Sequence, residues 1–143
     1  MLDGHNVFVD EEATFGKSWG MLEYLQEDAT PVIVVGIDCN HQPNNGRLSE
    51  YTPFSFNDEK YGMIHARGRL FMDWLTQTLK PMVDERYPTI PDREATWIAG
   101  SSMGGLMSLY AVTAYNWCFG KCAALSPSLW TSPKKLNGLF RTV

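Results

Sequence analysis

The chain is organised around one segment, Thr96-Trp-Ile-Ala-Gly-Ser-Ser102-Met-Gly-Gly-Leu-Met-Ser-Leu-Tyr-Ala111. Its first part, 95–99, is a short apolar run that predicts a buried parallel strand. Residues 103–115 contain no helix breaker beyond the opening glycines and predict a helix. Between the two lies Gly100-Ser101-Ser102-Met103-Gly104, which fits G-x-S-x-G, the pattern of a nucleophile elbow in this order of strand, turn and helix. The segment therefore predicts a reactive serine at Ser102.

The two glycines of the motif have a steric reason. In so sharp a turn Gly100 and Gly104 face each other across the bend, and a side chain at either position would clash. The serine is held in a strained backbone conformation, at a cost of about 1–3 kcal/mol that functional sites tolerate. Its hydroxyl is expected above the sheet edge, near the positive end of the following helix. An ordinary serine at a strand–helix corner is the alternative interpretation.

Composition restricts the class of protein. The chain has 143 residues, 44% of them hydrophobic, which predicts a single domain over residues 1–143 with an ample core. A net charge of −4 without a basic face argues against nucleic acid as a partner. We also expect no signal peptide and no membrane partner, because no apolar run is long enough to cross a bilayer. Three cysteines at no metal-like spacing favour free thiols in a reducing, cytoplasmic compartment.

The rest of the chain alternates predicted helices with predicted strands. The expected helices cover 19–28 (capped by Ser18), 67–86 and the residues after Ser132-Pro133. The expected strands cover 32–37 and 121–126, and a long loop covers 38–58. Pro81 should kink the long helix or begin a second segment. This alternation predicts an α/β fold with a mostly parallel sheet and flanking helices.

Aromatic side chains are assigned from their positions. Phe71, Trp74 and Trp97 lie on an apolar helical stripe or an inner strand and are expected in the core. Trp130 follows the carboxyl end of a predicted strand, the side where open α/β sheets bind ligands. Its side chain is either the wall of a substrate pocket or ordinary packing, and the sequence leaves both open.

Two further patterns suggest ligands but are incomplete. Gly16-Lys17-Ser18 resembles the end of a phosphate-binding loop, yet Glu11 stands where that loop requires a glycine. Asp38, Cys39 and His41 are metal-ligand types without a second pair at zinc-like spacing, so a polar loop is the preferred interpretation. We therefore expect no cofactor and no metal.

Three pieces together resemble the Putative esterase family of α/β-hydrolases, which includes enterochelin, feruloyl and S-formylglutathione esterases and the mycolyl transferases. These pieces are 2–6 (Leu-Asp-Gly-His-Asn), 36–53 (Gly-Ile-Asp followed by Arg-Leu-Ser-Glu-Tyr-Thr-Pro) and 100–105 (Gly-Ser-Ser-Met-Gly-Gly), with 124–130 (Ala-Leu-Ser-Pro-Ser-Leu-Trp) as a further match. The resemblance implies a partial α/β-hydrolase fold. It also implies that Ser102 is the nucleophile and that the backbone N–H groups of His5 and Met103 form the oxyanion hole.

The resemblance leaves the catalytic base unassigned. In α/β-hydrolases the triad runs Ser, then Asp or Glu, then His, whereas His5, His41 and His65 all precede Ser102. The resemblance places the acid and the histidine beyond Val143, so we expect an incomplete domain from the middle of a longer hydrolase. Such a piece is expected to be inactive and poorly soluble by itself. A base supplied by His41 or His65 through the long loop is the alternative.

These observations predict a serine carboxylic-ester hydrolase that acts on a small-molecule ester through an acyl-Ser102 intermediate. An acyltransferase of the same fold would pass the acyl group to an alcohol instead of water. A non-catalytic hydrolase-like module used for binding is the alternative from a different class. The acyl group, the leaving group and the oligomeric state are not encoded in any pattern that we can interpret.

Overall fold

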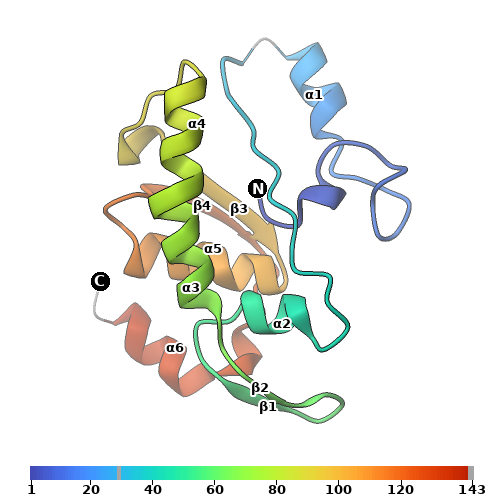
Figure 1. Cartoon of the computed structure of the whole chain (residues 1–143), viewed down its shortest axis with the longest axis vertical. Helices are drawn as coiled ribbons and strands as arrows, with labels where there is room; N and C mark the ends of the chain where they lie inside the picture. Colours follow the sequence, from blue (N-terminus) through green and yellow to red (C-terminus); the bar gives the residue numbers. More distant parts are fainter. Residues whose placement is uncertain (29, 142–143) are drawn as a thin grey trace. The chain divides into compact units, whose positions relative to one another are not determined.

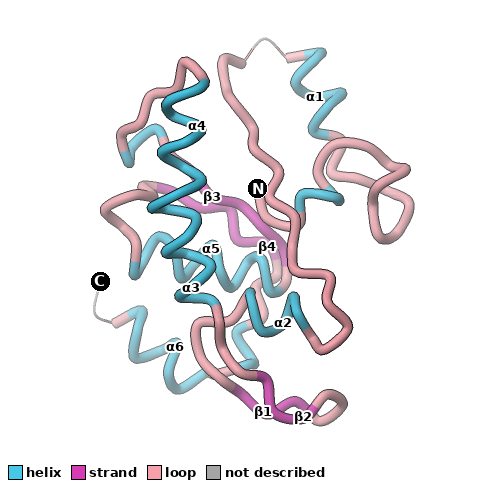
Figure 2. Tube along the Cα trace, in the orientation of Figure 1, coloured by secondary structure: helices cyan, strands magenta, loops and turns pink. Residues whose placement is uncertain are grey.

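The structure is a computed structural model that describes residues 1–28 and 30–141 (Figures 1 and 2). The chain divides into two compact units, 1–39 and 40–143, and each is described by itself. The single domain expected over residues 1–143 stays a prediction. Within the described residues, no helix is both long enough and apolar enough to span a membrane.

The first unit contains two short helices and an extended segment. The 3-10 helix η1 covers Gly4–Asn6 and the helix α1 covers Met21–Glu27. The extended segment returns beside the start of the chain, where Gly4 N–H donates to Ile37 O and Ile37 N–H donates to Met1 O, both at 2.8 Å. Leu2 and Val7 are buried at this junction of the unit.

The strand predicted over 32–37 is wrong in extent. The structure has only a single parallel bridge there, between Leu2 and Ile37. The reason is the short partner segment, because the chain turns into η1 at Gly4 directly after the bridge. Val32 and Ile33 are half exposed, at 50% and 48%, although their β-branched side chains favour a buried strand.

The helix predicted over 19–28 begins later, at Met21. Gly20 takes a left-handed conformation with φ of 64° and stops the helix from extending towards the N-terminus. Ser18 does not cap the helix by the usual N-cap contact; its hydroxyl accepts a hydrogen bond from Gly20 N–H at 3.1 Å. The predicted helix is therefore present, and its start was misplaced by two residues.

The second unit holds the remaining elements. Its helices are α2 (Gly46–Glu50), α3 (Gly68–Trp74), the π-helical segment η2 (Leu75–Leu79), α4 (Lys80–Arg86), η3 (Arg93–Ala95), α5 (Met103–Ala114), η4 (Leu129–Thr131) and α6 (Pro133–Phe140). Its strands are β1 (Phe56–Asp58), β2 (Gly62–Ile64), β3 (Trp97–Ser101) and β4 (Lys121–Leu125). Helix and sheet are thus mixed as predicted, and each sheet in the described part of the chain has two strands.

The centre of the second unit is a parallel pair of strands covered by α5. β3 and β4 pair in register from Trp97 opposite Lys121 to Ser101 opposite Leu125 (Figure 1). Leu106, Met107 and Ala111 of α5 are fully buried. This strand–helix–strand arrangement confirms the elements predicted around Ser102 and places the serine at the carboxyl end of β3.

Of the three aromatic residues expected in the core, one is buried and two are exposed. Phe71 is buried, at 7% exposure, whereas Trp74 and Trp97 are exposed at 44% and 62%. For the two tryptophans the prediction was therefore wrong. Trp97 opens β3 on an exposed position, where Lys121 Nζ lies 4.6 Å from its ring centroid. An apolar residue type does not by itself reveal which face of a two-stranded sheet is covered.

The loop predicted over 38–58 contains regular structure that the sequence did not reveal. It includes α2, and it ends in β1, which pairs with β2 in an antiparallel hairpin. Phe56 and Ile64 lie opposite each other and are both buried. The turn at the tip has Gly62 at φ of 71°, and Asp58 accepts hydrogen bonds from the N–H groups of Lys60 and Tyr61.

The long helix predicted over 67–86 is confirmed as α3, η2 and α4, which follow one another without a break (Figure 1). Pro81 lies in the first turn of α4, where its missing N–H is tolerated. The π-helical turn directly before it absorbs the change in hydrogen bonding. The proline therefore begins a second segment, one of the two outcomes that the sequence predicts.

Candidate active site

Ser102 lies in the turn between β3 and α5, in a conformation that L-amino acids rarely adopt. Its φ is 56° and its ψ is −115°. The N–H of Ser102 donates to Leu125 O at 2.9 Å, and its carbonyl accepts from Leu106 N–H at 3.0 Å, so strand pairing and helix both hold the residue. Ser102 is exposed. A strained, exposed serine between a strand end and a helix start has the geometry required of a nucleophile elbow.

The glycines of the motif are required by close backbone contacts. A Cβ added to Gly100 would lie 2.7 Å from both the carbonyl carbon and the oxygen of Gly104, which is closer than any real Cβ contact. A Cβ on Gly105 would lie 2.9 Å from Leu125 O in the neighbouring strand. Both obstacles are backbone and cannot move aside. The steric argument made from the sequence is confirmed for Gly100, whose added Cβ would meet the Gly104 backbone; a clash of a side chain at Gly104 stays a prediction.

Met103 is the first residue of α5, and its side chain is buried while its amide lies at the helix N-terminus. Within the described residues, the Met103 N–H donates to no backbone carbonyl. Amides in the first turn of a helix have no intrahelical acceptor and carry the positive end of the helix dipole. The Met103 N–H can therefore act as a donor to an oxyanion formed at Ser102.

The second unit brings one unpredicted side chain to Ser102. The hydroxyl of Ser128, in the turn after β4, lies 3.1 Å from the hydroxyl of Ser102. Ser128 is 5% exposed. No local pattern in the sequence indicates this contact, because it depends on the parallel pairing of β4 with β3. Neither His41 nor His65 is hydrogen-bonded to Ser102 within the described part of the second unit.

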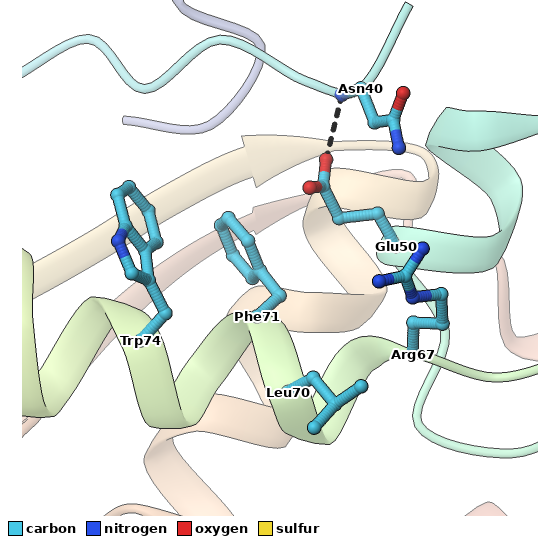
Figure 3. Close-up of a pocket in the computed structure, with 6 residues that line it drawn as sticks. All are labelled: Asn40, Glu50, Arg67, Leu70, Phe71 and Trp74. Carbon is cyan, nitrogen blue, oxygen red and sulfur yellow. Dashed lines mark hydrogen bonds between the residues drawn. The ribbon is translucent and has the colours of Figure 1, made fainter. Parts of the chain in front are cut away.

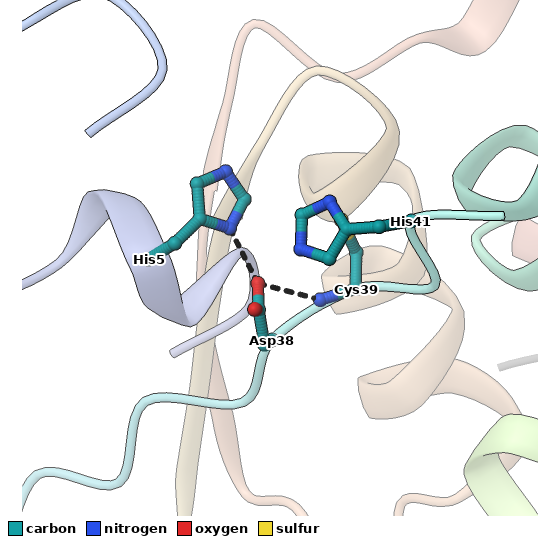
Figure 4. A group of neighbouring side chains, drawn as sticks. All are labelled: His5, Asp38, Cys39 and His41. Carbon is teal, nitrogen blue, oxygen red and sulfur yellow. Dashed lines mark hydrogen bonds and ion pairs between the residues drawn. The ribbon is translucent and has the colours of Figure 1, made fainter. Parts of the chain in front are cut away.

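His5 lies in the first unit, in the middle of η1, two residues after Asp3, which has a left-handed φ of 55°. Its Nδ1 is hydrogen-bonded to Asp38, whose carboxylate also accepts from Cys39 N–H at 2.9 Å (Figure 4). The backbone at Gly4 is packed so closely that a Cβ there would lie 2.9 Å from Gly36 C. The structure thus fixes the His5 turn against the 36–39 segment of the same unit.

The hydrogen bonds around His5 determine which ring nitrogen carries the proton. Thr14 N–H donates to Asn6 Oδ1 at 2.8 Å, which leaves the Asn6 amide nitrogen facing His5 Nε2 at 3.0 Å. Because an amide nitrogen only donates, Nε2 must accept, and the proton is on Nδ1, directed at Asp38. The sequence did not predict the pair of His5 and Asp38.

The side chains of His5, Asp38 and Cys39 offer ligand atoms within 4.8 Å of one another. Nitrogen, carboxylate oxygen and sulfur donors are the set that zinc and similar ions accept. The Nδ1 proton of His5 occupies the position between nitrogen and carboxylate that an ion would need. Metal binding through His5 Nδ1 would require this proton to leave, and the expectation that the chain binds no metal stays a prediction.

Residues of the Gly16-Lys17-Ser18 stretch are hydrogen-bonded to the carboxylate of Asp10. Lys17 Nζ donates to Asp10 Oδ2 at 3.0 Å, and the Ser18 N–H and hydroxyl donate to Asp10 Oδ1 at 2.8 and 2.9 Å. These hydrogen bonds, the one from the Ser18 N–H first among them, lower the pKa of Asp10 to about 2. A carboxylate thus occupies the donors that a phosphate would require.

A cavity of about 200 Å³ lies beside α3 in the second unit (Figure 3). It is lined by Asn40, Glu50, Arg67, Leu70, Phe71 and Trp74. The Glu50 carboxylate accepts from Asn40 N–H at 2.7 Å, and Phe71 and Trp74 lie 6.0 Å apart between ring centroids. The lining of the cavity thus combines the apolar side chains of Leu70, Phe71 and Trp74 with the charged side chains of Glu50 and Arg67.

Trp130 lies in η4 and is 60% exposed. One edge of its ring packs against Phe56 of β1, with centroids 5.6 Å apart and planes at 88°. The contact joins the hairpin to the turn that carries Ser128. Its role as a wall of the substrate pocket stays a prediction.

Comparison with known proteins places the chain in a family. The model of the Putative esterase family matches residues 1–139. A Bacillus subtilis (strain 168) relative described as "Uncharacterized protein YbbA" is 28% identical over 126 residues, which cover 85% of this chain and 48% of YbbA. The "Iron(III) salmochelin esterase" of Escherichia coli O6:H1 (strain CFT073) is 30% identical over 114 residues, 77% of this chain and 24% of that protein.

The chain thus spans about half the length of YbbA and about a quarter of the salmochelin esterase. No solved structure matches it. The family model, in contrast, covers nearly the whole chain, including the residues on which the resemblance rests. This protein belongs to the Putative esterase family.

Proposed function

We propose that this chain carries the nucleophile of a serine carboxylic-ester hydrolase. The observation that carries the proposal is the conformation of Ser102, strained at φ of 56°, exposed, and placed at the N-terminus of α5. Membership of an esterase family supports the same reaction class. We also infer that β3, α5 and β4 are the elbow region of an α/β-hydrolase fold, with Gly100 and Gly104 allowing the bend.

In the proposed reaction the Ser102 oxygen attacks the ester carbonyl and its proton passes to a histidine base. The carbonyl oxygen becomes an oxyanion that accepts from the Met103 N–H and, by the family resemblance, from the His5 N–H. One such donor lowers the activation barrier by about 3–4 kcal/mol. The alcohol leaves with the proton held by the base, and water then releases the acid from acyl-Ser102.

The base and its orienting acid are proposed to lie in sequence beyond this chain. The described residues of the second unit support this, because the side-chain hydrogen bond of Ser102 there is to Ser128 and not to a histidine. A histidine must approach a serine within about 2.6–3.2 Å to take its proton. Without it, only the residual catalysis of the oxyanion hole is expected.

The substrate is proposed to be a small-molecule ester. The relative named iron(III) salmochelin esterase supports this class of substrate without specifying the acyl group. Trp130, exposed after β4, is the candidate side chain for a substrate contact. We propose a reducing compartment such as the cytoplasm, which the free thiols of Cys118 and Cys122 support.

Covalent labelling of the full-length gene product tests the proposal. A fluorophosphonate should label the wild-type protein at Ser102, and Ser102→Ala should abolish labelling. Ser101→Ala is the matched control, since Ser101 is the adjacent serine at the end of β3 and should leave labelling intact. Labelling that persists in Ser102→Ala would refute the assignment of the nucleophile.

A model ester supplied with an added alcohol separates the reaction classes. Release of the free acid is expected for a hydrolase. Formation of a new ester with the added alcohol would identify an acyltransferase. Binding of the ester without turnover or labelling would identify a non-catalytic module.

A further inference from the structure

The hydroxyl of Ser128 is directed at the proposed nucleophile. Its oxygen lies 3.1 Å from Ser102 Oγ, within hydrogen-bond distance. The two residues are 26 positions apart in the sequence and meet because β3 and β4 pair in parallel, which brings both strand ends to one edge. Ser128 is buried, whereas Ser102 is exposed, so the contact lies beneath the hydroxyl that a substrate would reach.

Ser128 is held at its backbone as well as its side chain. Its N–H donates to Ser102 O at 3.0 Å, and its carbonyl accepts from the Thr131 hydroxyl at 3.1 Å. Ser126, two residues earlier, has a left-handed φ of 42°, so the chain turns sharply out of β4 to bring Ser128 back. These constraints fix the position of the Ser128 Cβ, from which the hydroxyl reaches Ser102 Oγ.

The chemistry of the proposed reaction determines which hydroxyl donates. Each serine has one proton, and Ser102 must direct its own towards the base that removes it. The hydrogen bond between the two oxygens is then the one that Ser128 donates and Ser102 accepts. The geometry points to Ser128 as a further catalytic residue, whose hydroxyl donates a hydrogen bond to Ser102 Oγ throughout the reaction; this inference rests on the proposed function.

Such a donor acts on both chemical steps. During attack, negative charge builds on Ser102 Oγ as its proton leaves for the base, and a hydrogen bond to that oxygen stabilises the charge. During hydrolysis of the acyl-enzyme, the bond from the acyl carbon to Oγ breaks while the bond to water oxygen forms. Oγ is then the leaving group, and the base returns its proton. Ser128 keeps its own proton in both steps.

A purely structural role of Ser128 makes a different prediction. The hydrogen bond from Ser128 N–H to Ser102 O is made by the backbone and persists when Ser128 is replaced by alanine. Ser128→Ala therefore removes the hydroxyl and leaves the backbone tie in place. Ser128→Thr retains a hydroxyl at the same position and is the matched control.

The measurement is the second-order rate constant of fluorophosphonate labelling in the full-length gene product. In labelling, the bond from Ser102 Oγ to phosphorus forms, fluoride leaves and the base takes the proton. The final labelled fraction gives the fraction of protein that is folded and able to react. The rate constant for that fraction measures how fast Ser102 attacks the fluorophosphonate. Ser128→Ala is expected to slow labelling about tenfold to a hundredfold, the effect of one hydrogen bond to a group that becomes charged. Ser128→Thr should stay within about threefold of wild type on the same scale.

The outcomes separate this inference from the proposed function. An unchanged rate constant in Ser128→Ala, with Ser102 still labelled, overturns the role of Ser128 alone. A Ser128→Thr rate as low as that of Ser128→Ala also overturns it, because the hydroxyl would not be the cause. A wild-type protein that is not labelled at Ser102 overturns the proposed function and this inference with it.

Discussion

The phenolic hydroxyl of Tyr115 donates to the Asp73 carboxylate at 2.7 Å and joins the end of α5 to α3. The two residues are 42 positions apart, and Tyr115 is buried at 8% exposure. The contact fixes the C-terminal end of the helix whose N-terminus carries the proposed active site. The stability of this helix pair is therefore linked to the position of Ser102.

Removal of the Tyr115 hydroxyl should destabilise the protein. Tyr115→Phe keeps the ring and leaves Asp73 without this donor, so we expect a loss of about 1–2 kcal/mol in the free energy of unfolding. Tyr87→Phe is the control, since Tyr87 is 56% exposed and should change stability little. Urea denaturation measures both, and equal stabilities of the two variants would contradict the role of the Tyr115 contact.

The same contact predicts an alkaline limit to stability. Burial, followed by the hydrogen bond to Asp73, raises the pKa of Tyr115 above its ordinary value. The unfolded chain then loses this proton at a lower pH than the folded protein does. The stabilisation is complete below the pKa of an unfolded tyrosine, about 10, and decreases as pH rises beyond it. The slope of stability against pH above that value should be shallower in Tyr115→Phe; identical slopes would exclude Tyr115 as the cause.

Substitution of Gly100 should disrupt the elbow. In Gly100→Ala the new Cβ would collide with the Gly104 backbone, so we expect a loss of more than about 2 kcal/mol and loss of fluorophosphonate labelling. Gly138→Ala is the matched control, since Gly138 lies within α6 and a Cβ there meets nothing within 4 Å. It should be neutral or stabilising by up to about 1 kcal/mol. A fully stable and labelled Gly100→Ala protein would contradict the packing of the bend.

Acid should release the loop around Asp10. The pKa of Asp10 is lowered to about 2, first by the hydrogen bond from the Ser18 N–H. The unfolded chain binds the proton first, so the stabilisation is complete above a pH of about 4 and decreases as pH falls towards 2. The protection factor of the Ser18 amide against hydrogen exchange should decrease over this range, and at neutral pH in Asp10→Asn. Equal exchange of that amide in wild type and variant would show that Asp10 does not hold the loop.

Features of the fold that depend on local sterics could be predicted from sequence. The G-x-S-x-G motif restricts the backbone within five residues, and both strand and helix follow from the residues beside it. Pro81 likewise acts through its own ring and missing N–H. These constraints do not depend on a distant partner, so β3, α5 and the start of α4 were predicted close to their observed positions.

Features of the fold that depend on a partner strand could not be predicted from the sequence. The β-branched run over 32–37 has strand propensity, but its partner in the first unit allows a single bridge at Ile37. The hairpin of β1 and β2, in contrast, is present but was not predicted. Its strands are too short to show an alternating pattern in the sequence, and they are stabilised by pairing with each other, as at Phe56 opposite Ile64. Burial of side chains also depends on a partner, since Trp97 is exposed on a two-stranded sheet although it is apolar.

The sequence by itself determined a serine in a tight turn between strand and helix, because the sterics of that turn are set by five consecutive residues. Only the tertiary structure decided what surrounds it. The hydroxyl of Ser128 reaches Ser102 through the register of two strands, and the proton of His5 is fixed by Asn6, Thr14 and Asp38. A hydrogen bond between residues far apart in the chain requires that both be brought to one place, and no local pattern specifies that place.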